Sequence, residues 1–254
     1  MIHIERRGAV TVVVLDRPER RNALDHDHCE QLATIVRAAP DGGARALVLA
    51  GAGPHFCSGA DLTGVEDAAF VGTLHEALEA LATVPVPTIA AVHGAVLGAG
   101  SQLAIACDLR VAEPSARFAI PAAKLGLMVD HWTIARLALL AGHGPARAML
   151  IAAEEYDAQA AHALGLVQRL GDRASALGWA EELTTLAPLT MAGHKLGLNL
   201  LEAGLGRPAG DGARGGPGGD GAYDAAFHAA WSSRDLAEAM AARAERRSPR
   251  FEGR

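Results

Sequence analysis

The first part of the chain repeats one order of elements: a short apolar segment, a turn rich in small residues, and a helical stretch. Four apolar segments are typical of strands, over residues 9–15, 46–49, 88–92 and 109–112. Helical periodicity follows the first two of them, over about 25–38 and 66–83. Strands that alternate with helices form parallel sheets, so this order predicts an α/β fold.

From Trp132 onward the pattern becomes mostly helical. The helix-like segments are 132–140, 145–153, 157–164, 174–186, 222–231 and 233–246, and residues 167–170 are typical of a strand. Residues 204–221, GLGRPAGDGARGGPGGDG, are half glycine, so burial cannot offset the entropy of ordering them; a phosphate site there would need a preceding strand, which is missing. We therefore expect a core over 1–190 and a helical region over 191–254 with a flexible insertion at about 204–221.

The composition of the 254-residue chain excludes several classes of protein. Half of the residues are hydrophobic and a fifth are charged, which is typical of a soluble globular protein. The net charge of −6 offers no basic face for nucleic acid. Cys29, Cys57 and Cys107 are odd in number and widely spaced, which indicates a reducing cytoplasm and neither disulfides nor a thiolate metal site. Residues 1–7 carry no apolar signal region, and the most apolar stretch, 88–107, is too interrupted to span a membrane.

Residues 94–111, GAVLGAGSQLAIACDLRV, join a glycine-rich turn to the start of a helix. The first turn of a helix leaves N–H groups without partners and carries the positive end of the helix dipole, so this segment can bind an anion or an oxyanion. A dinucleotide fingerprint would need a third glycine where Leu103 stands, and an acid about 20 residues further on. The other interpretation is an oxyanion site that combines the Ala99 N–H with one from the similar turn FCSGAD, residues 56–61.

Five motifs carry a family resemblance. They are RPERRNAL (17–24), FCSGADL (56–62), AAVHGAVLGAGSQLAIACDLRVA (90–112), FAIPAAKLGL (118–127) and AQAAHALGLVQRL (158–170). In order and spacing, over nearly the whole chain, they resemble the crotonase superfamily of enoyl-CoA hydratases and isomerases. The resemblance implies a spiral of repeated ββα units followed by a helical C-terminal region that packs homotrimers, often paired into hexamers. It also implies an acyl-CoA or enoyl-CoA thioester as ligand, with no cofactor beyond the coenzyme A of that ligand and no metal.

The resemblance further implies where the thioester would bind. Members of the superfamily polarise the thioester carbonyl with two main-chain N–H groups, which by position would be those of Ala60 and Ala99. The hydratases add water with two glutamates, and their positions hold Gln102 and Ala122 here. An amide and a methyl group do not transfer protons, and each positioned acid or base supplies about 10²–10⁴-fold in rate, so we expect weak or absent hydration. Gln102 also fits a buried amide that cross-links backbone groups at a helix start.

Asp130 is the acid that remains in the right neighbourhood. By spacing it matches an aspartate that dienoyl-CoA isomerases of the superfamily use as a proton carrier and aroyl-CoA dehalogenases use as a nucleophile. It also stands one residue before a helical run, where aspartate is a favoured N-cap, and both interpretations stay open. His131 and Trp132 replace small residues of the hydratases and should reshape the acyl pocket. An acid–base couple of Asp130 with His131 is a further alternative, although neighbours on a helix point about 100° apart.

Three residues are candidates for contacts with coenzyme A. Arg17 and Arg21 lie close to the NAL turn and could bind its phosphates, although surface arginines are often merely solvated. Phe251 matches a C-terminal aromatic residue that members of the superfamily lay against coenzyme A across a subunit contact.

The sequence thus leads to one main functional hypothesis and two alternatives. The pattern of Gln102, Pro121, Lys124 and Asp130-His131-Trp132 resembles an actinobacterial branch of the superfamily that lacks the hydratase glutamates. The main hypothesis is a protein of lipid metabolism that binds fatty acyl-CoA and hydrates enoyl-CoA weakly or not at all. The first alternative is an isomerase, or another enzyme of enolate chemistry, that uses Asp130. The second is a structural or partner-binding protein that does not bind coenzyme A.

Overall fold

The computed structural model describes residues 1–61, 68–205 and 221–254. Its main sheet has the strand order β1-β2-β3-β4-β6-β9. These strands are β1 (Ile2–Arg7), β2 (Val10–Leu15), β3 (Ala46–Gly51), β4 (Thr88–Val92), β6 (Leu109–Ala112) and β9 (Arg169–Leu170). β1 runs antiparallel to β2, and the other neighbours in this sheet are parallel. The predicted parallel α/β sheet is therefore confirmed.

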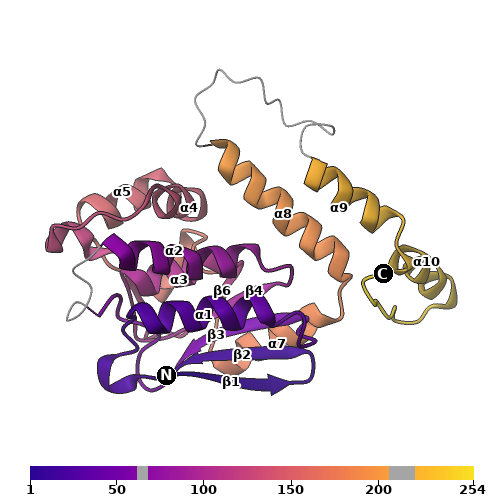
Figure 1. Ribbon diagram of the computed structural model, residues 1–254, viewed down its shortest axis with the longest axis horizontal. Coiled ribbons are helices and arrows are strands. Elements are labelled where there is room, and N and C mark those ends of the chain that lie inside the picture. Colours follow the sequence, from indigo (N-terminus) through magenta and orange to yellow (C-terminus); the bar gives the residue numbers. More distant parts are fainter. Residues whose placement is uncertain (62–67, 206–220) are drawn as a thin grey trace.

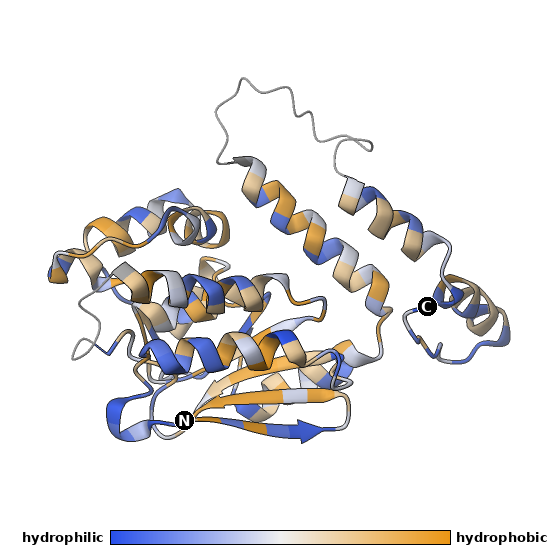
Figure 2. Ribbon diagram, in the orientation of Figure 1, coloured by the Kyte–Doolittle hydropathy of each residue, from blue (hydrophilic) through white to orange (hydrophobic). Residues whose placement is uncertain are grey.

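Both faces of this sheet are buried, which explains why its inner strands are continuous apolar runs. Alternate side chains such as Val13 and Leu47 pack under α1 (His26–Ala38), α2 (Ala68–Thr83) and α3 (Ala99–Ala106). The intervening ones, such as Val12 and Val48, pack against α7 (Arg173–Thr184). Figure 2 shows the contrast between the apolar β2 and the edge strand β1, which carries hydrophilic residues.

A second, three-stranded sheet continues the strand-turn-helix pattern beyond β4. It contains β5 (Ala95–Leu97), β7 (Arg117–Ala119) and β8 (Tyr156–Asp157), with β5 parallel to β7 and β8 antiparallel to it. The short helices η1 (Pro18–Arg20) and η2 (Pro121–Leu125) follow β2 and β7. Because β5 lies between β4 and α3, it fixes the path of the glycine-rich turn that starts α3.

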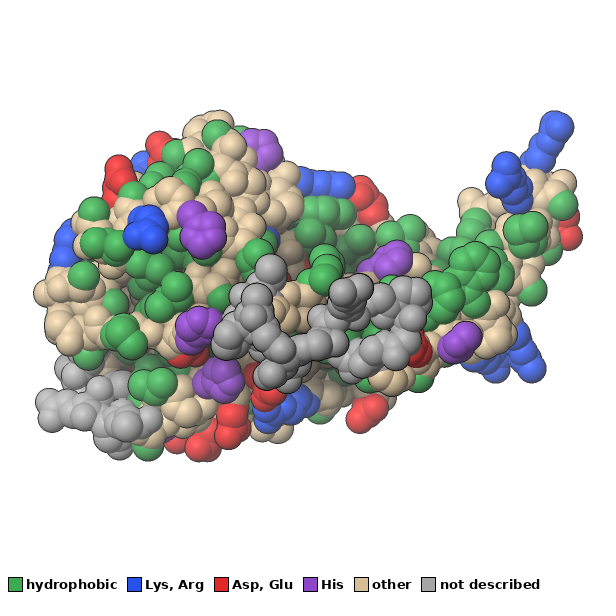
Figure 3. Space-filling model, turned by 90° about the horizontal axis from the view of Figure 1, so that it is seen from above, with side chains coloured by type: hydrophobic (Ala, Val, Ile, Leu, Met, Phe, Trp, Pro, Cys, Tyr) green, Lys and Arg blue, Asp and Glu red, His purple; other side chains and the backbone are tan. Residues whose placement is uncertain are grey.

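The C-terminal part of the chain is helical, as expected. Besides α7, its helices are α4 (His131–Ala141), α5 (His143–Ile151), α6 (Ala158–Ala163), α8 (Pro188–Leu205), α9 (Gly221–Trp231) and α10 (Arg234–Glu245). α8 packs against α2, α4 and α9, and α9 and α10 lie to the side of the sheet (Figure 1). These helices expose large apolar side chains, among them Leu198, Leu201, Phe227, Trp231 and Met240. Figure 3 shows such side chains gathered on the C-terminal helices, at the right of the view.

Several elements differ from the sequence-based expectations. β1 was not expected, because its residues IHIERR are largely charged, and neither were α8 and the short strands β5, β7 and β8. The division at residue 190 stays a prediction, and α8, which begins at Pro188, spans that boundary. Residues 66 and 67 of the helix predicted over 66–83, and residues 206–220 of the predicted flexible insertion, lie outside the described residues.

The three cysteines are free and buried. Burial raises the pKa of each thiol, to about 12 for Cys29, Cys57 and Cys107, so they remain protonated at neutral pH. Within the described ranges, no group of histidine, cysteine and acidic side chains could hold a metal ion. None of the helices there is long and apolar enough to cross a membrane.

Candidate functional site

Two glycine-containing turns, one in the loop after β3 and one directly after β5, lie next to each other. The loop after β3 pairs with β5, because the Cys57 N–H donates to the Ala95 carbonyl (3.0 Å) and the Leu97 N–H to the Cys57 carbonyl (3.0 Å). A methyl group added at Gly59 would lie 3.1 Å from the Leu97 carbonyl oxygen and 3.7 Å from the Ala99 nitrogen. The turn that carries Ala60 therefore touches the turn that begins α3.

Each of these turns depends on a glycine directly before a predicted donor. Gly59 has φ +111°, and Gly98 has φ +52° with ψ −117°. Residues with a Cβ atom disfavour backbone conformations with positive φ, whereas glycine adopts them without strain. The two glycines therefore set the directions of the Ala60 and Ala99 N–H groups.

Both N–H groups are directed away from their neighbouring backbone partners. Leu24 and Ala60 form an isolated parallel bridge, in which the Leu24 N–H donates to the Gly59 carbonyl (2.9 Å) and the Asp61 N–H to the Leu24 carbonyl (2.7 Å). Because peptide groups alternate along an extended chain, the Ala60 N–H points away from Leu24. Ala99 is the first residue of α3, where an N–H has no partner within the helix. Over the residues that the structure describes, neither N–H has a hydrogen-bond acceptor.

Gln102 lies on the first turn of α3, close to these donors. Its side chain is 6% exposed, and its Nε2 donates to the Thr133 Oγ1 at 2.7 Å. The Thr133 N–H in turn donates to the Asp130 Oδ1 at 2.8 Å, which makes Asp130 the N-cap of α4. The amide thus cross-links α3 to α4, and the N-cap interpretation of Asp130 is confirmed.

Asp130 has a second partner that the sequence did not indicate. The Asp130 Oδ2 lies 3.3 Å from the Nδ1 of His75 on α2. His131 is exposed and forms no couple with Asp130, so the histidine beside this carboxylate is His75. No motif pointed to His75, because only the packing of α2 beside α3 and α4 brings it there.

The other predicted pocket residues are partly buried around this cluster. Ala122 lies in η2 and Trp132 on the first turn of α4, and both pack against the main core. The Arg136 guanidinium lies 5.8 Å from the centre of the Trp132 ring. Trp132 thus packs against the core with part of its surface exposed, and Ala122 contributes no titratable group.

The two predicted coenzyme A arginines have different surroundings. The Arg17 Nη1 lies 3.2 Å from the Asp25 Oδ2 and 3.0 Å from the Asp61 Oδ2, so this guanidinium already faces two carboxylates. Arg21 is exposed, and among the described residues its guanidinium has no hydrogen bond or ion pair. Burial, followed by the positive charges of Arg21 and His93, lowers the pKa of the neighbouring His55. Unlike Arg17, Arg21 therefore has a guanidinium without a partner among the described residues.

Phe251 lies away from these residues. Its carbonyl accepts a hydrogen bond from the Arg45 Nη1 (2.6 Å), and Arg45 directly precedes β3 at the amino end of that strand. Ala60 lies in the loop that follows the carboxyl end of β3, and Ala99 follows β5, which pairs with that loop. Within one chain, Phe251 and the two donors are therefore at opposite edges of the sheet, and in Figure 1 the C-terminus lies to the right of α4.

Comparison with known proteins gives consistent matches. The family model for enoyl-CoA hydratase/isomerase matches residues 5–254. A Mycobacterium tuberculosis (strain CDC 1551 / Oshkosh) protein named "Probable enoyl-CoA hydratase echA6" is 44% identical over 261 residues, covering 100% of both chains, and the Mycobacterium leprae protein of that name is 41% identical over 265 residues, also covering 100% of both chains. The crystal structure of an enoyl-CoA hydratase/carnithine racemase from Magnetospirillum magneticum, 29% identical, superposes with a TM-score of 0.85 and covers 100% of this chain and 96% of the other.

Proposed function

This chain belongs to the enoyl-CoA hydratase/isomerase family of the crotonase superfamily, and from that premise we propose that it binds fatty acyl-CoA thioesters with little or no hydratase activity. The observation that carries the proposal is a contrast within one site. The two touching turns present N–H groups at Ala60 and Ala99 that have no acceptor in the described part of the chain, whereas the glutamate positions hold Gln102 and Ala122. The site therefore has two hydrogen-bond donors for a carbonyl oxygen but lacks the two glutamates that add water.

The two N–H groups suit the oxygen of a thioester carbonyl. Hydrogen bonds to that oxygen draw electron density from the carbonyl, and the dipole of α3 acts in the same direction. One such donor contributes about 2.7–4 kcal/mol to a transition state in enzymes where it has been removed. Without an acid and a base at the acyl carbons, the donors bind and polarise the thioester but do not complete hydration.

The rest of the ligand would extend over neighbouring surfaces. Arg21 and the exposed Arg20 offer cations for the phosphates of coenzyme A, and His131 and Trp132 border the acyl group. Because Phe251 lies at the other edge of the sheet, it would reach coenzyme A only from a neighbouring subunit. That requirement, with the exposed apolar side chains of α8, α9 and α10, supports a homotrimer or hexamer. A role in cytoplasmic lipid metabolism is part of the same proposal and follows from the acyl-CoA ligand.

Ligand binding and hydration test this proposal in parallel. Saturated acyl-CoA should raise the melting temperature more than free coenzyme A does, because free coenzyme A lacks the acyl group and the thioester carbonyl oxygen that Ala60 and Ala99 would bind. Crotonyl-CoA should lose its conjugated absorbance far more slowly than at the ordinary enzymatic rate of about 10 s⁻¹. Hydration at such a rate, or equal stabilisation by coenzyme A and acyl-CoA, would contradict the proposal.

One observation favours a second candidate function, a single-acid isomerase. The Asp130 carboxylate is 23% exposed and has His75 at 3.3 Å, so a proton acceptor and a second titratable group stand side by side near Gln102. Turnover of a dienoyl-CoA that disappears in Asp130→Asn would establish it. Asparagine also caps helices well, so α4 should survive the substitution.

A further inference from the structure

We propose that Arg17 is a positioning residue of the oxyanion site, where it holds Asp25 and Asp61 together and thereby fixes the direction of the Ala60 N–H. The inference rests on the proposed function of that N–H group. It assigns Arg17 to the protein's own carboxylates rather than to a phosphate of the ligand.

The ion pairs lie directly beyond the backbone bridge that orients Ala60. Leu24 and Ala60 form the bridge, and Asp25 and Asp61 are the next residues on the two segments. The Arg17 Nη1 contacts both carboxylates, at 3.2 and 3.0 Å, and so closes the end of this pairing. An isolated bridge has few hydrogen bonds, so a charged link between the residues that follow it restricts how far the Ala60 peptide can rotate.

Arg17 is itself held by the turn in which it lies. Its backbone N–H donates to the Asn22 Oδ1 at 2.8 Å. The Nδ2 of Asn22 donates to the carbonyls of Ala52 (2.9 Å) and His55 (2.7 Å), in the loop that leads to Ala60. Asn22 is 1% exposed, so the arginine stands on a fixed support rather than on a mobile surface turn.

The charges around Arg17 argue against a phosphate ligand at this position. Its side chain is 22% exposed, and the Asp61 side chain is 11% exposed, so solvent screens the contact incompletely. A phosphate brought to this guanidinium would also approach the carboxylates of Asp25 and Asp61. Arg21 has no such acidic neighbours among its described contacts and is the better phosphate ligand.

The test uses an acyl-CoA that reports carbonyl polarisation. A para-dimethylaminocinnamoyl-CoA absorbs at longer wavelength when hydrogen bonds draw charge onto its thioester oxygen, so its red shift measures the oxyanion site separately from affinity. We expect Arg17→Met to bind this ligand more weakly than the wild type, because one contact to the thioester oxygen is lost, and the ligand that is bound to lose most of its red shift. Arg17→Lys should recover part of the shift, because an ammonium group can contact a carboxylate but lacks the fork of the guanidinium.

Arg21→Met is the matched control. Loss of a charge-assisted phosphate contact should weaken binding about tenfold and leave the red shift of the bound ligand unchanged. If Arg17→Met behaves in this way instead, Arg17 is a phosphate ligand and the inference is wrong. If Arg17→Met does not fold, Asp61→Asn decides, because it removes the same charge pair from the other side and should also reduce the shift; an unchanged shift in Asp61→Asn overturns the inference. Binding without any red shift in the wild type would refute the proposed oxyanion site itself, and this inference with it.

Discussion

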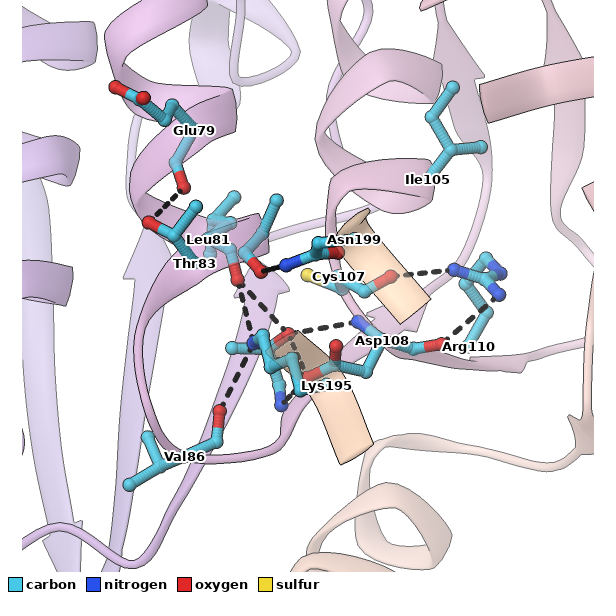
Figure 4. A network of polar contacts seen from close by, with 12 residues as sticks. Glu79, Leu81, Thr83, Val86, Ile105, Cys107, Asp108, Arg110, Lys195 and Asn199 are labelled. Atoms are coloured by element: carbon cyan, nitrogen blue, oxygen red, sulfur yellow. Dashed lines mark hydrogen bonds and ion pairs between the residues drawn. The ribbon is translucent and has the colours of Figure 1, made fainter. Parts of the chain in front are cut away.

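Two polar clusters on either side of α3 differ in how many of their hydrogen-bonding groups are used. At one cluster, Lys195 of α8 is 8% exposed and donates to the carbonyls of Leu81 (3.0 Å) and Val86 (3.2 Å) and to the Asp108 Oδ2 (2.8 Å). Asp108 also accepts from the backbone and the hydroxyl of Thr88. Figure 4 shows Lys195 among Leu81, Val86 and Asp108. At the other cluster, Ala60 and Ala99 keep N–H groups without acceptors among the described residues.

The difference separates a structural role from a binding role. All three donors of the Lys195 ammonium group are engaged, so this cluster has nothing to offer a ligand and serves to fasten α8 to the core. The N–H groups of the two glycine turns have no acceptor among the described residues, so under the proposed function they are available to a ligand oxygen. Titratable side chains alone would have suggested the opposite assignment.

The largest expected effect comes from breaking the satisfied cluster. Lys195→Met leaves the Asp108 carboxylate without its cation, and removing one partner of a buried pair typically costs about 3–5 kcal/mol. Chemical unfolding should show that loss of stability. Lys124, the other lysine, is exposed, so Lys124→Met should change the free energy of unfolding by less than about 0.5 kcal/mol. Equal effects of the two substitutions would show that the Lys195 contacts do not hold α8.

The second effect comes from the turn before α3. In Gly98→Ala the added methyl would meet only the Gly59 Cα, at 3.8 Å, so the cost is conformational, about 1–3 kcal/mol for a residue held at this φ and ψ. Relaxation of the turn would redirect the Ala99 N–H, so acyl-CoA binding, measured by calorimetry, should weaken as well.

Gly178→Ala is its control. Gly178 lies inside α7 with nothing within 4 Å of the added methyl, so alanine should stabilise the protein by up to about 1 kcal/mol without affecting the ligand. Full acyl-CoA affinity in Gly98→Ala would show that the turn does not direct a donor.

The sequence predicted the elements of the fold better than the contacts within the site. The apolar runs that became β2, β3, β4 and β6 are buried on both faces, so their pattern carries the signal directly. The edge strand β1 was missed because half of it faces solvent. The residues that position Ala60 and Ala99 were partly visible, since glycine-rich turns after strands have few structural alternatives.

Contacts between distant elements carried no such signal. The contact of His75 with Asp130 depends on how α2 and α4 pack. The sequence pattern of a histidine on a solvated helix face is the same whether or not such a neighbour is present. The engagement of Arg17 by Asp25 and Asp61 likewise follows from the Leu24–Ala60 bridge, which joins segments 36 residues apart in sequence. Arg17 and Arg21 were therefore indistinguishable as candidates until the fold placed carboxylates beside one of them.

A third prediction concerns the cluster that links Gln102 to Asp130. Its polar groups have hydrogen-bond partners, as those around Lys195 do, but the central contact is the N-cap of α4 and not an ion pair. Asp130→Ala should lower the stability by about 0.5–2 kcal/mol through loss of the cap of α4, and Asp130→Asn by only a few tenths of that, because asparagine accepts the same Thr133 N–H. Thermal unfolding of the two variants measures the difference. A cost in Asp130→Asn as large as in Asp130→Ala would mean that the carboxylate charge, and not the cap, holds this cluster together.

The smallest expected change in stability concerns the ion pairs of Arg17 with Asp25 and Asp61, whose carboxylates are partly exposed. Burial raises the pKa of Asp25, but the hydrogen bonds from His28 and the charge of Arg17 outweigh it and hold this pKa below its ordinary value of 3.8. A lowered pKa in the folded state stabilises the protein above the unfolded pKa, and that contribution is lost as the pH falls through the folded pKa. Asp25→Asn should therefore lower the free energy of unfolding by about 0.2–1 kcal/mol at neutral pH, and the difference from the wild type should shrink toward zero in acid. Urea unfolding at several pH values measures this difference.

Asp157→Asn is the control for the cap, since Asp157 also caps a helix through the Ala160 N–H but forms no ion pair among its described contacts. A difference that stays constant between neutral and acid pH would mean that Asp25 acts only as a cap, and that the link to Arg17 contributes no charge interaction.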